Sequence, residues 1–366
     1  EPGQGAVSGS ARDGAQREGE AVTARLDGSA AASADSEQLA TERLEEGSEA
    51  ERADTVAGAE LAIGTVIGGR YELLRRVAGG SMGVVYKALD RQRTLETHEP
   101  SWVAVKVLTP RLDRHGPALR ALQREAETGL LLDHPNVVRF HGLGRDGNRF
   151  YIVMEWLPGC SLADWLDRRP GEPMPAGDAL HIVRSIGAAL AHAHERGVVH
   201  ADVKPGNVML LPDGGVQLCD FGIARLDRVL ATGTGTFDPG VLKAATPAYS
   251  SPEVLKGETP TIRDDVYSLA CVAYRMLSGR RVYGSRDALE AEAAGESPRR
   301  IEGLGEARWG ALEAALAYSR YQRPPDVRTF LRPFAAQGRG RRRRALLALA
   351  VLLLAAAAIV VPLAAS

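Results

Sequence analysis

The sequence predicts a two-lobed α+β fold, in which a small β-rich lobe precedes a larger helical lobe and one C-terminal transmembrane helix follows. Three observations predict it. Residues 71–160 contain short runs of β-branched and aromatic residues, which are typical of strands. Residues 161–335 contain long apolar-faced segments with helical spacing, separated by Pro- and Gly-rich turns. Residues 345–365 form an uncharged, almost wholly apolar run that is long enough to cross a bilayer.

The first 64 residues differ from the rest of the chain in composition and charge. They hold 14 acidic and 5 basic residues, whereas the remainder holds 40 basic and 32 acidic ones, so the net charge of −1 hides two opposite contributions. This segment is rich in Ala, Gly, Ser and Glu and has no aromatic residue. It offers too little apolar surface to offset the entropy of ordering. We therefore expect residues 1–64 to be a disordered acidic tail.

The three cysteines are odd in number and widely spaced: Cys160, Cys219 and Cys271. This pattern indicates neither a disulfide framework nor a zinc site, and it fits a reducing compartment. We expect no secretory signal before the folded part. The chain begins with Glu1 rather than Met, which leaves open that it is a fragment or a processed form.

The first lobe is expected over residues 65–158. Residues 117–132 have the apolar spacing of a helix, which His134-Pro135-Asn136 would end. Residues 90–101 are polar, and we expect a loop there. Four β-type runs predict strands: 71–74, 84–86, 102–108 and 150–154.

The second lobe is expected over residues 159–335, where three segments predict helices: 179–195, 266–277 and 307–318. A small β lobe followed by a larger α lobe leaves a cleft between them. Such a cleft is a usual place for a ligand.

The C-terminal part predicts a membrane anchor. Residues 336–344 include the cluster Arg-Gly-Arg-Arg-Arg-Arg, which favours the cytoplasmic side of a membrane. The apolar run 345–365 would extend about 30 Å as a helix, which is close to the thickness of a bilayer core. A buried helix of a soluble domain is disfavoured, because the run has no polar face. We expect a single-pass membrane protein whose folded part is cytoplasmic.

A glycine-rich segment and a strand lysine suggest a phosphate site. Residues 77–86 read VAGGSMGVVY and lie between two predicted strands. Glycines let a hairpin backbone approach phosphates and offer them N–H groups, although an ordinary hairpin explains this segment alone equally well. Lys106 lies in an apolar strand, where a lysine is costly unless paired. Glu125 is the natural partner and would aim Lys106 at nucleotide phosphates. The alternative is a surface lysine that extends to solvent.

The stretch from His200 to Asp220 carries the most specific chemistry. It presents Asp202, Lys204 and Asn207 within HADVKPGN, and Asp220 begins Asp-Phe-Gly. This set suits metal-assisted phosphoryl transfer. One carboxylate would orient a hydroxyl, a carboxylate and an amide would hold Mg²⁺, and the lysine would offset charge on the phosphoryl group.

These motifs, in this order, resemble those of the eukaryotic-type protein kinases, most closely the membrane-anchored bacterial Ser/Thr kinases. The resemblance covers about residues 70–335. It implies the bilobal protein kinase fold, ATP as substrate, Mg²⁺ or Mn²⁺ as cofactor, and proteins with Ser or Thr hydroxyls as acceptors. It also implies that Asp202 is the catalytic base, that Lys204 is catalytic, and that Asn207 and Asp220 bind the metal. Lys204 and Thr246 match the Ser/Thr rather than the Tyr group.

The resemblance also implies a nucleotide site at the hinge between the lobes. The backbone of Glu155 and Leu157 would bond the adenine edge, and Val85, Ala104 and Met209 would enclose the ring. Each of these apolar residues could equally belong to an ordinary core. The full set implied for ATP is Val77, Ala78, Gly80, Gly83, Val85, Ala104, Lys106, Glu125, Glu155, Leu157 and Met209.

Residues 246–253, TPAYSSPE, resemble the end of a kinase activation segment. The resemblance implies that Thr246 contacts the catalytic loop and shapes the acceptor site. It implies a structural bridge between Glu253 and Arg323, and that Asp265 braces the catalytic-loop backbone. Three histidines are expected to be structural: His192, His194 and His200.

The chain departs from the family pattern at three positions. Ala78 stands in place of the first loop glycine, which puts the affinity for nucleotide in doubt. Ser251 stands in place of the usual Ala, a conservative change. Ala201 stands in place of the arginine that normally meets a phosphorylated residue of the activation segment.

We therefore predict that activity depends only weakly on phosphorylation of the activation segment. The candidate acceptors there are Thr232, Thr234 and Thr236. With Ala201 the charge that would pair with a phosphate is absent, so replacing all three threonines by Ala should leave most of the transfer rate. Phosphoryl transfer by the triple variant checks this, and complete loss of activity would contradict it.

Two other functions remain open. A nucleotide-binding pseudokinase or scaffold would share the fold without the chemistry, although every residue for phosphoryl transfer is present. A small-molecule phosphotransferase of the antibiotic- or choline-kinase type shares a similar catalytic loop, but the SPE ending, Asp265 and Arg323 disfavour it. No nucleic-acid partner is expected, and homodimerisation is left open.

Overall fold

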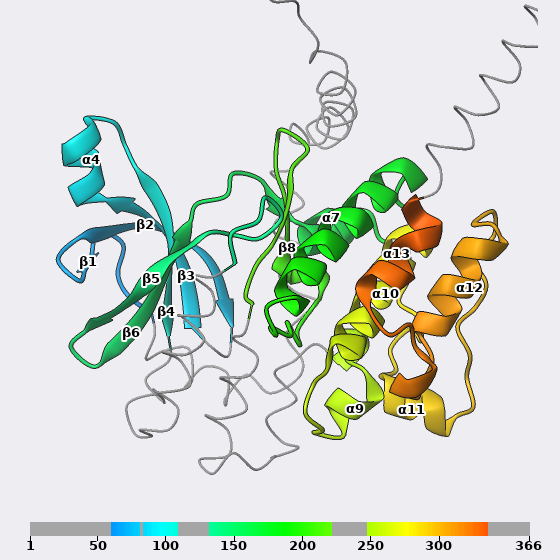
Figure 1. Ribbon diagram of the computed structural model, residues 1–366. Helices are drawn as coiled ribbons and strands as arrows, with labels where there is room; N and C mark the ends of the chain where they lie inside the picture. Colours follow the sequence, from blue (N-terminus) through cyan, green and yellow to red (C-terminus); the bar gives the residue numbers. More distant parts are fainter. Residues whose placement is uncertain (1–59, 81–82, 109–131, 222–246, 336–366) are drawn as a thin grey trace, which may run out of the picture.

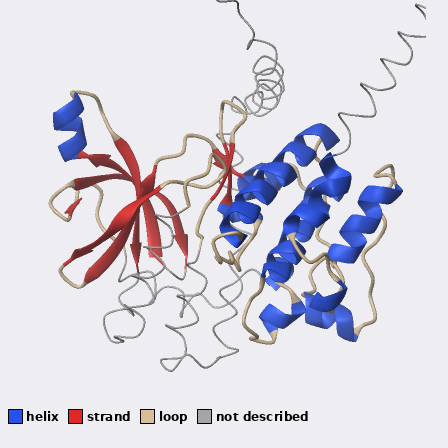
Figure 2. Ribbon diagram, viewed as in Figure 1, coloured by secondary structure: helices blue, strands red, loops and turns tan. Residues whose placement is uncertain are grey.

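The computed structural model describes residues 60–80, 83–108, 132–221 and 247–335 (Figure 1). A β-sheet lobe and a helical lobe lie side by side, as the sequence predicts (Figure 2). The fold expectation is confirmed for these two lobes.

The sheet of the first lobe has six antiparallel strands in the order β1-β2-β3-β4-β6-β5. The strands predicted from the four β-type runs are all present. The bounds are β1 Val66–Ile67, β2 Tyr71–Gly80, β3 Gly83–Asp90, β4 Trp102–Leu108, β5 Phe140–Asp146 and β6 Arg149–Glu155.

Alternation along β3 and β4 separates the two faces of this sheet. Val84 and Tyr86 belong to one apolar cluster, whereas Val85 and Ala104 belong to another. Because side chains two residues apart share a face, Lys106 leaves the sheet on the same side as Ala104. Val85 pairs directly with Lys106 across the strands. The lysine therefore belongs to the face that also receives side chains from the second lobe, among them Met209 and Cys219.

Residues 91–97 form helix α4 (Arg91–Thr97), so the prediction of a loop over 90–101 was wrong in this part. Asp90 caps the helix by accepting a hydrogen bond from the Arg93 amide at 3.2 Å. It also binds the guanidinium of Arg70 through two contacts of 2.8 and 2.7 Å. None of the helical residues is buried, so the segment has no apolar periodicity by which a helix could be recognised.

The second lobe is built around α7 and α10, which pack against each other and against α13. Helices predicted at 179–195 and 266–277 are confirmed, and the one expected over 307–318 ends at Ala315. Gly187 allows close packing here, because a Cβ at this position would lie 2.4 Å from Leu331 Cδ1. The helices are α6 Leu162–Asp167, α7 Ala176–His194, α9 Pro252–Leu255, α10 Ile262–Ser278, α11 Ala288–Ala293, α12 Glu306–Ala315 and α13 Val327–Ala335.

A small three-stranded sheet, β7-β8-β9, lies where the two lobes meet (Figure 1). Its strands are β7 Cys160–Ser161, β8 Val208–Leu210 and β9 Val216–Leu218. The segment before β5 is tied to β9, since the Val138 amide donates to the Leu218 carbonyl at 3.1 Å and the Leu218 amide donates to the Asn136 carbonyl at 2.8 Å. These bonds fix the base of the first lobe to the β8–β9 hairpin of the second lobe.

Within the described ranges, no helix has both the length and the apolarity needed to cross a bilayer. The predicted basic segment 336–344 and apolar run 345–365 lie outside those ranges, as do residues 1–59 of the predicted tail and the predicted helix up to residue 131.

Candidate active site

The loop between α7 and β8 brings Asp202, Lys204 and Asn207 together. The side-chain amide nitrogen of Asn207 donates to the Asp202 backbone carbonyl at 2.8 Å and to the Asp202 carboxylate at 3.0 Å. The Lys204 ammonium lies 2.8 Å from the same carboxylate. The short 3-10 turn Pro205–Asn207 reverses the chain direction, so the Asn207 side chain comes within hydrogen-bonding distance of Asp202. The Asp202 carboxylate is thus held in one orientation by two donors.

The backbone of this loop is strained, and hydrogen bonds to the Asp265 side chain on α10 hold it in place. Ala201 has a φ of 62°, a left-handed conformation that costs an L-residue about 1–2 kcal/mol. The fully buried Asp265 carboxylate accepts hydrogen bonds from the His200 amide at 2.9 Å and the Ala201 amide at 2.8 Å. His194 on α7 contacts the same carboxylate at 2.7 Å. The predicted bracing role of Asp265 is confirmed.

His200 connects the catalytic loop to the segment that carries Asp220. Its Nδ1 accepts a hydrogen bond from the Asp202 amide at 3.2 Å, so Nε2 carries the proton and donates to the Cys219 carbonyl at 2.9 Å. The ring also packs on Phe221, with 4.6 Å between centroids. The structural role expected for His200 is confirmed.

Lys106 and Asp220 face each other from the two lobes. The Lys106 ammonium lies 2.8 Å from the Asp220 carboxylate, and its side chain is only 7% exposed. Burial alone would raise the pKa of Asp220, but the charge and hydrogen bond of Lys106 hold that pKa below its ordinary value. Asp220 also has a left-handed φ of 62°. The expected partner Glu125 lies outside the described residues, and the partner seen for Lys106 is Asp220.

Asn207 and Asp220 offer oxygen atoms of the kind that a small hard cation binds. The side-chain nitrogen of Asn207 donates to Asp202. Among the described residues, the side-chain oxygen of Asn207 accepts no hydrogen bond. The described ranges hold no group of three or more His, Cys, Asp or Glu side chains around one point. Carboxylate and amide oxygens are ligand types that suit Mg²⁺, which usually completes its shell with waters and phosphate oxygens.

The residues expected around adenine pack in one apolar cluster under the sheet. Val85, Ala104, Leu157 and Met209 all belong to it. Leu157 is a buried residue, and its backbone N–H donates no hydrogen bond to the part of the chain that the structure describes. A buried N–H without a partner is costly, so a ligand edge at this position would stabilise it. Glu155, which the resemblance also implies at the adenine edge, ends β6 and is exposed.

The glycine-rich segment forms the hairpin between β2 and β3. Val77 and Ala78 are exposed near the end of β2, and Gly80 pairs with Gly83 across the turn. Gly83 has a φ of +148°, and a Cβ there would lie 2.0 Å from the Val107 carbonyl oxygen. The strand next to the hairpin therefore leaves no room for a side chain at this position.

Gly83→Ala should displace β3 from β4 and weaken nucleotide binding. The clash is with backbone rather than with a flexible side chain, so we expect a loss of about 1–3 kcal/mol in stability. The KM for ATP should rise as well, because the hairpin beside Lys106 moves. Thermal unfolding and ATP titration measure both effects. Gly310→Ala, inside α12 with open space around its Cβ, is the matched control: it should leave the KM for ATP unchanged and raise stability by about 0.5–1 kcal/mol. A loss of stability from Gly310→Ala equal to that from Gly83→Ala would contradict this.

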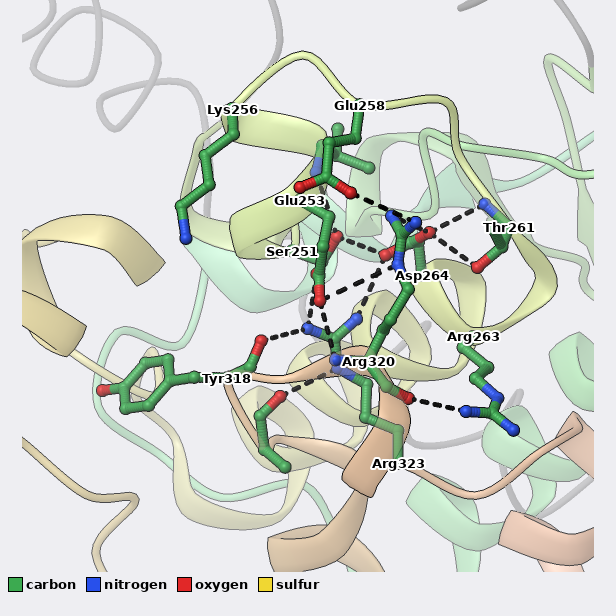
Figure 3. Close-up of polar contacts among 12 residues, drawn as sticks. Ser251, Glu253, Lys256, Glu258, Thr261, Arg263, Asp264, Tyr318, Arg320 and Arg323 are labelled. Atoms are coloured by element: carbon green, nitrogen blue, oxygen red, sulfur yellow. Dashed lines mark hydrogen bonds and ion pairs between the residues drawn. The ribbon is translucent and has the colours of Figure 1, made fainter.

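The end of the activation segment is anchored in the second lobe. Glu253 binds Arg323 at 2.6 Å, which confirms the predicted bridge. Three further members of this cluster were not predicted from the sequence: Ser251, Asp264 and Arg320 (Figure 3). Two sequence features could have indicated this cluster: the adjacent acidic residues Asp264 and Asp265, and the closely spaced Arg320 and Arg323. Thr246, expected to contact the catalytic loop, lies outside the described residues.

Comparison with known proteins agrees with this geometry. A family model described as "Protein kinase domain" matches residues 71–317. The serine/threonine-protein kinase PrkC of Bacillus subtilis (strain 168) is 35% identical over 233 residues, 63% of this chain and 33% of PrkC. The serine/threonine-protein kinase PknA of Mycobacterium tuberculosis (strain ATCC 25618 / H37Rv) is also 35% identical over 233 residues, 62% of this chain and 51% of PknA. The chain thus spans a third to a half of these relatives.

A solved structure supports the same fold. The crystal structure of the Mycobacterium tuberculosis PknI kinase domain aligns with a TM-score of 0.59 and 28% identity. The alignment covers 76% of this chain and all of that domain.

Proposed function

The chain belongs to the protein kinase family, and we propose that it transfers the γ-phosphoryl group of ATP to Ser or Thr hydroxyls of proteins. One observation carries the proposal. Lys106 from the first lobe reaches Asp220, and the Asp220 segment is tied through His200 to the loop of Asp202 and Asn207. Groups more than a hundred residues apart in the chain thereby converge at one place.

Asp202 is proposed to orient the acceptor hydroxyl and to take its proton. Its carboxylate is fixed by Asn207 and Lys204 and remains partly accessible, with 18% of the side chain exposed. A carboxylate held in one orientation lowers the entropic cost of positioning the nucleophile. Lys204, 2.8 Å away, is proposed to offset negative charge on the phosphoryl group as it moves to the acceptor.

Asp220 and Asn207 are proposed to hold Mg²⁺. When bound, the metal supplies charge neutralisation at the phosphate oxygens. The lowered pKa of Asp220 keeps its carboxylate ionised at neutral pH, as a metal ligand must be. Lys106 is proposed to bind the α- and β-phosphates and to exchange its present contact with Asp220 for them. Val85, Ala104, Leu157 and Met209 would enclose the adenine.

The pseudokinase reading is less well supported. A pseudokinase of this fold would be expected to lack at least one of Lys106, Asp202, Asn207 and Asp220, and all four are present. A small-molecule phosphotransferase is disfavoured by the anchored activation-segment end, in which Glu253 binds Arg323.

Incubation of the purified chain with radiolabelled ATP, Mg²⁺ and a basic protein acceptor tests the proposal. We expect label on Ser or Thr of the acceptor and no transfer when Mg²⁺ is chelated. ATP binding without any transfer under these conditions would favour the pseudokinase. Transfer to small alcohols or amines but not to protein would favour the other alternative.

Membrane anchoring is a separate proposal that rests on the sequence of residues 336–365 alone. The basic cluster and the apolar run that follows it favour a single span with the kinase domain on the cytoplasmic side. Alkaline extraction of membranes from cells that express the chain tests this, since a spanning chain stays with the membrane and a peripheral one is released.

A further inference from the structure

Two consecutive carboxylates on the first turn of α10 hold two different parts of the active site. Asp265 accepts the backbone amides of the catalytic loop, as described above. Asp264 faces the end of the activation segment instead, where its side chain is 1% exposed (Figure 3). Its two oxygens accept five contacts: Ser251 Oγ at 2.7 Å, the Thr261 amide at 2.7 Å, Thr261 Oγ1 at 2.9 Å, Arg320 Nη2 at 3.1 Å and Arg323 Nη1 at 3.1 Å.

Ser251 is the direct connection between this carboxylate and the activation segment. It is fully buried, and it immediately precedes α9, which carries Glu253. Its hydroxyl donates to Asp264 at 2.7 Å, whereas its capping contact with the Val254 amide is long, at 3.4 Å. The tie to Asp264 is therefore the main interaction of this hydroxyl.

The two arginines close the cluster around the same carboxylate. Arg323 contacts both Glu253 and Asp264, and its remaining donors bind the carbonyls of Ala317 and Tyr318. Arg320 contacts Asp264 and Glu258, and its backbone amide donates to Glu253 at 2.7 Å. Each buried charge has at least one opposite partner. Burial alone would raise the pKa of Asp264, but the bonds from Ser251 and Thr261 and the charge of Arg320 lower it, so the carboxylate is ionised at neutral pH.

We propose that Asp264, acting through Ser251, is a positioning residue that fixes the acceptor-binding end of the activation segment relative to the catalytic loop. Asp264 and Asp265 are neighbours on one rigid helical turn, so the two parts of the site share one anchor. Ala201 offers no guanidinium to a phosphorylated activation segment, and this buried cluster supplies a tie that needs no phosphate. The inference rests on the proposed kinase function.

Ser251→Ala tests it, because the change removes the hydroxyl and little volume. Loss of a hydrogen bond to a buried charge should raise the KM for the protein acceptor about tenfold, while the KM for ATP stays within about twofold. Hydrogen exchange of the amides in residues 247–255 should quicken, and that of residues 200–207 should not. Ser268→Ala is the matched control: this buried serine is on the same helix, and within the described residues its hydroxyl donates to the Asp264 backbone carbonyl and not to the carboxylate. It should change neither readout.

The double variant Ser251→Ala, Asp264→Asn tests whether the Ser251 hydroxyl acts through the Asp264 carboxylate or has a merely structural effect. If the hydroxyl acts through the carboxylate, Ser251→Ala should have little further effect on exchange or acceptor KM once Asp264 is Asn. Equal behaviour of Ser251→Ala and Ser268→Ala, or a parallel rise in both KM values, would overturn the inference. Absence of transfer by the unmodified chain would instead overturn the proposed function, and the exchange experiment would still decide whether the tie exists.

Discussion

Asp202→Asn is expected to lower kcat by about 10²–10⁴-fold while ATP binding is retained. The substitution keeps the size and shape of the side chain but removes its ability to accept a proton. It also weakens the contacts with Lys204 and Asn207, which both donate to this carboxylate. ATP affinity should change little, because Asp202 is assigned to the hydroxyl and not to the nucleotide. Steady-state transfer rates and a nucleotide-binding titration measure the two quantities separately.

Asp213→Asn is the matched control for this variant. Asp213 is exposed in the turn between β8 and β9, where its carboxylate accepts a hydrogen bond from the Gly215 amide at 2.9 Å. An asparagine can accept the same bond, so this change should leave kcat within about twofold. Near-normal kcat for Asp202→Asn would remove the assignment of Asp202 as the base.

Lys106→Met should abolish phosphoryl transfer while the protein stays folded. A methionine side chain occupies the space of the buried aliphatic part of Lys106, but it provides no ammonium group for the phosphates or for Asp220. Since Lys106 is the main cause of the lowered pKa of Asp220, that pKa should rise in the variant and metal binding should weaken. We expect a fall of at least about 10²-fold in kcat/KM.

Transfer assays, ATP titration and thermal unfolding together check the Lys106 variant. Lys256→Met serves as the control, because Lys256 is exposed and its ion pair with Glu292 is 3.5 Å long. Such a surface pair contributes about 0–1 kcal/mol, so activity and unfolding should both be preserved. A Lys106 variant that transfers phosphate at the normal rate would show that this lysine does not bind the nucleotide.

Much of the candidate site could be predicted because its residues are close in sequence. Asp202, Lys204 and Asn207 fall within six residues, and a loop that short must place them near one another. The position of Lys106 in an apolar strand was also predicted, and that strand is β4. The bridge from Glu253 to Arg323 was predicted through the family resemblance and is confirmed.

Other features depend on tertiary contacts or on local capping that no apolar pattern reveals. The α4 helix has no buried residue and is stabilised by the cap from Asp90, so its sequence looks like a loop. Ser251 appeared to be a conservative change, yet its hydroxyl bonds a carboxylate thirteen residues away. The left-handed backbone at Ala201 is held by Asp265, 64 residues distant. Contacts of this kind emerge only when the helices are packed.

The central claim is that Lys106, Asp202, Asn207 and Asp220 act on one nucleotide between the lobes. A crystal structure of the chain with Mg²⁺ and a non-hydrolysable ATP analogue tests it most directly. The triphosphate should lie between Lys106 and the Gly80–Gly83 hairpin, with the metal on Asn207 and Asp220 and the terminal phosphate facing Asp202. An analogue bound elsewhere, or a metal that contacts neither Asn207 nor Asp220, would contradict the claim.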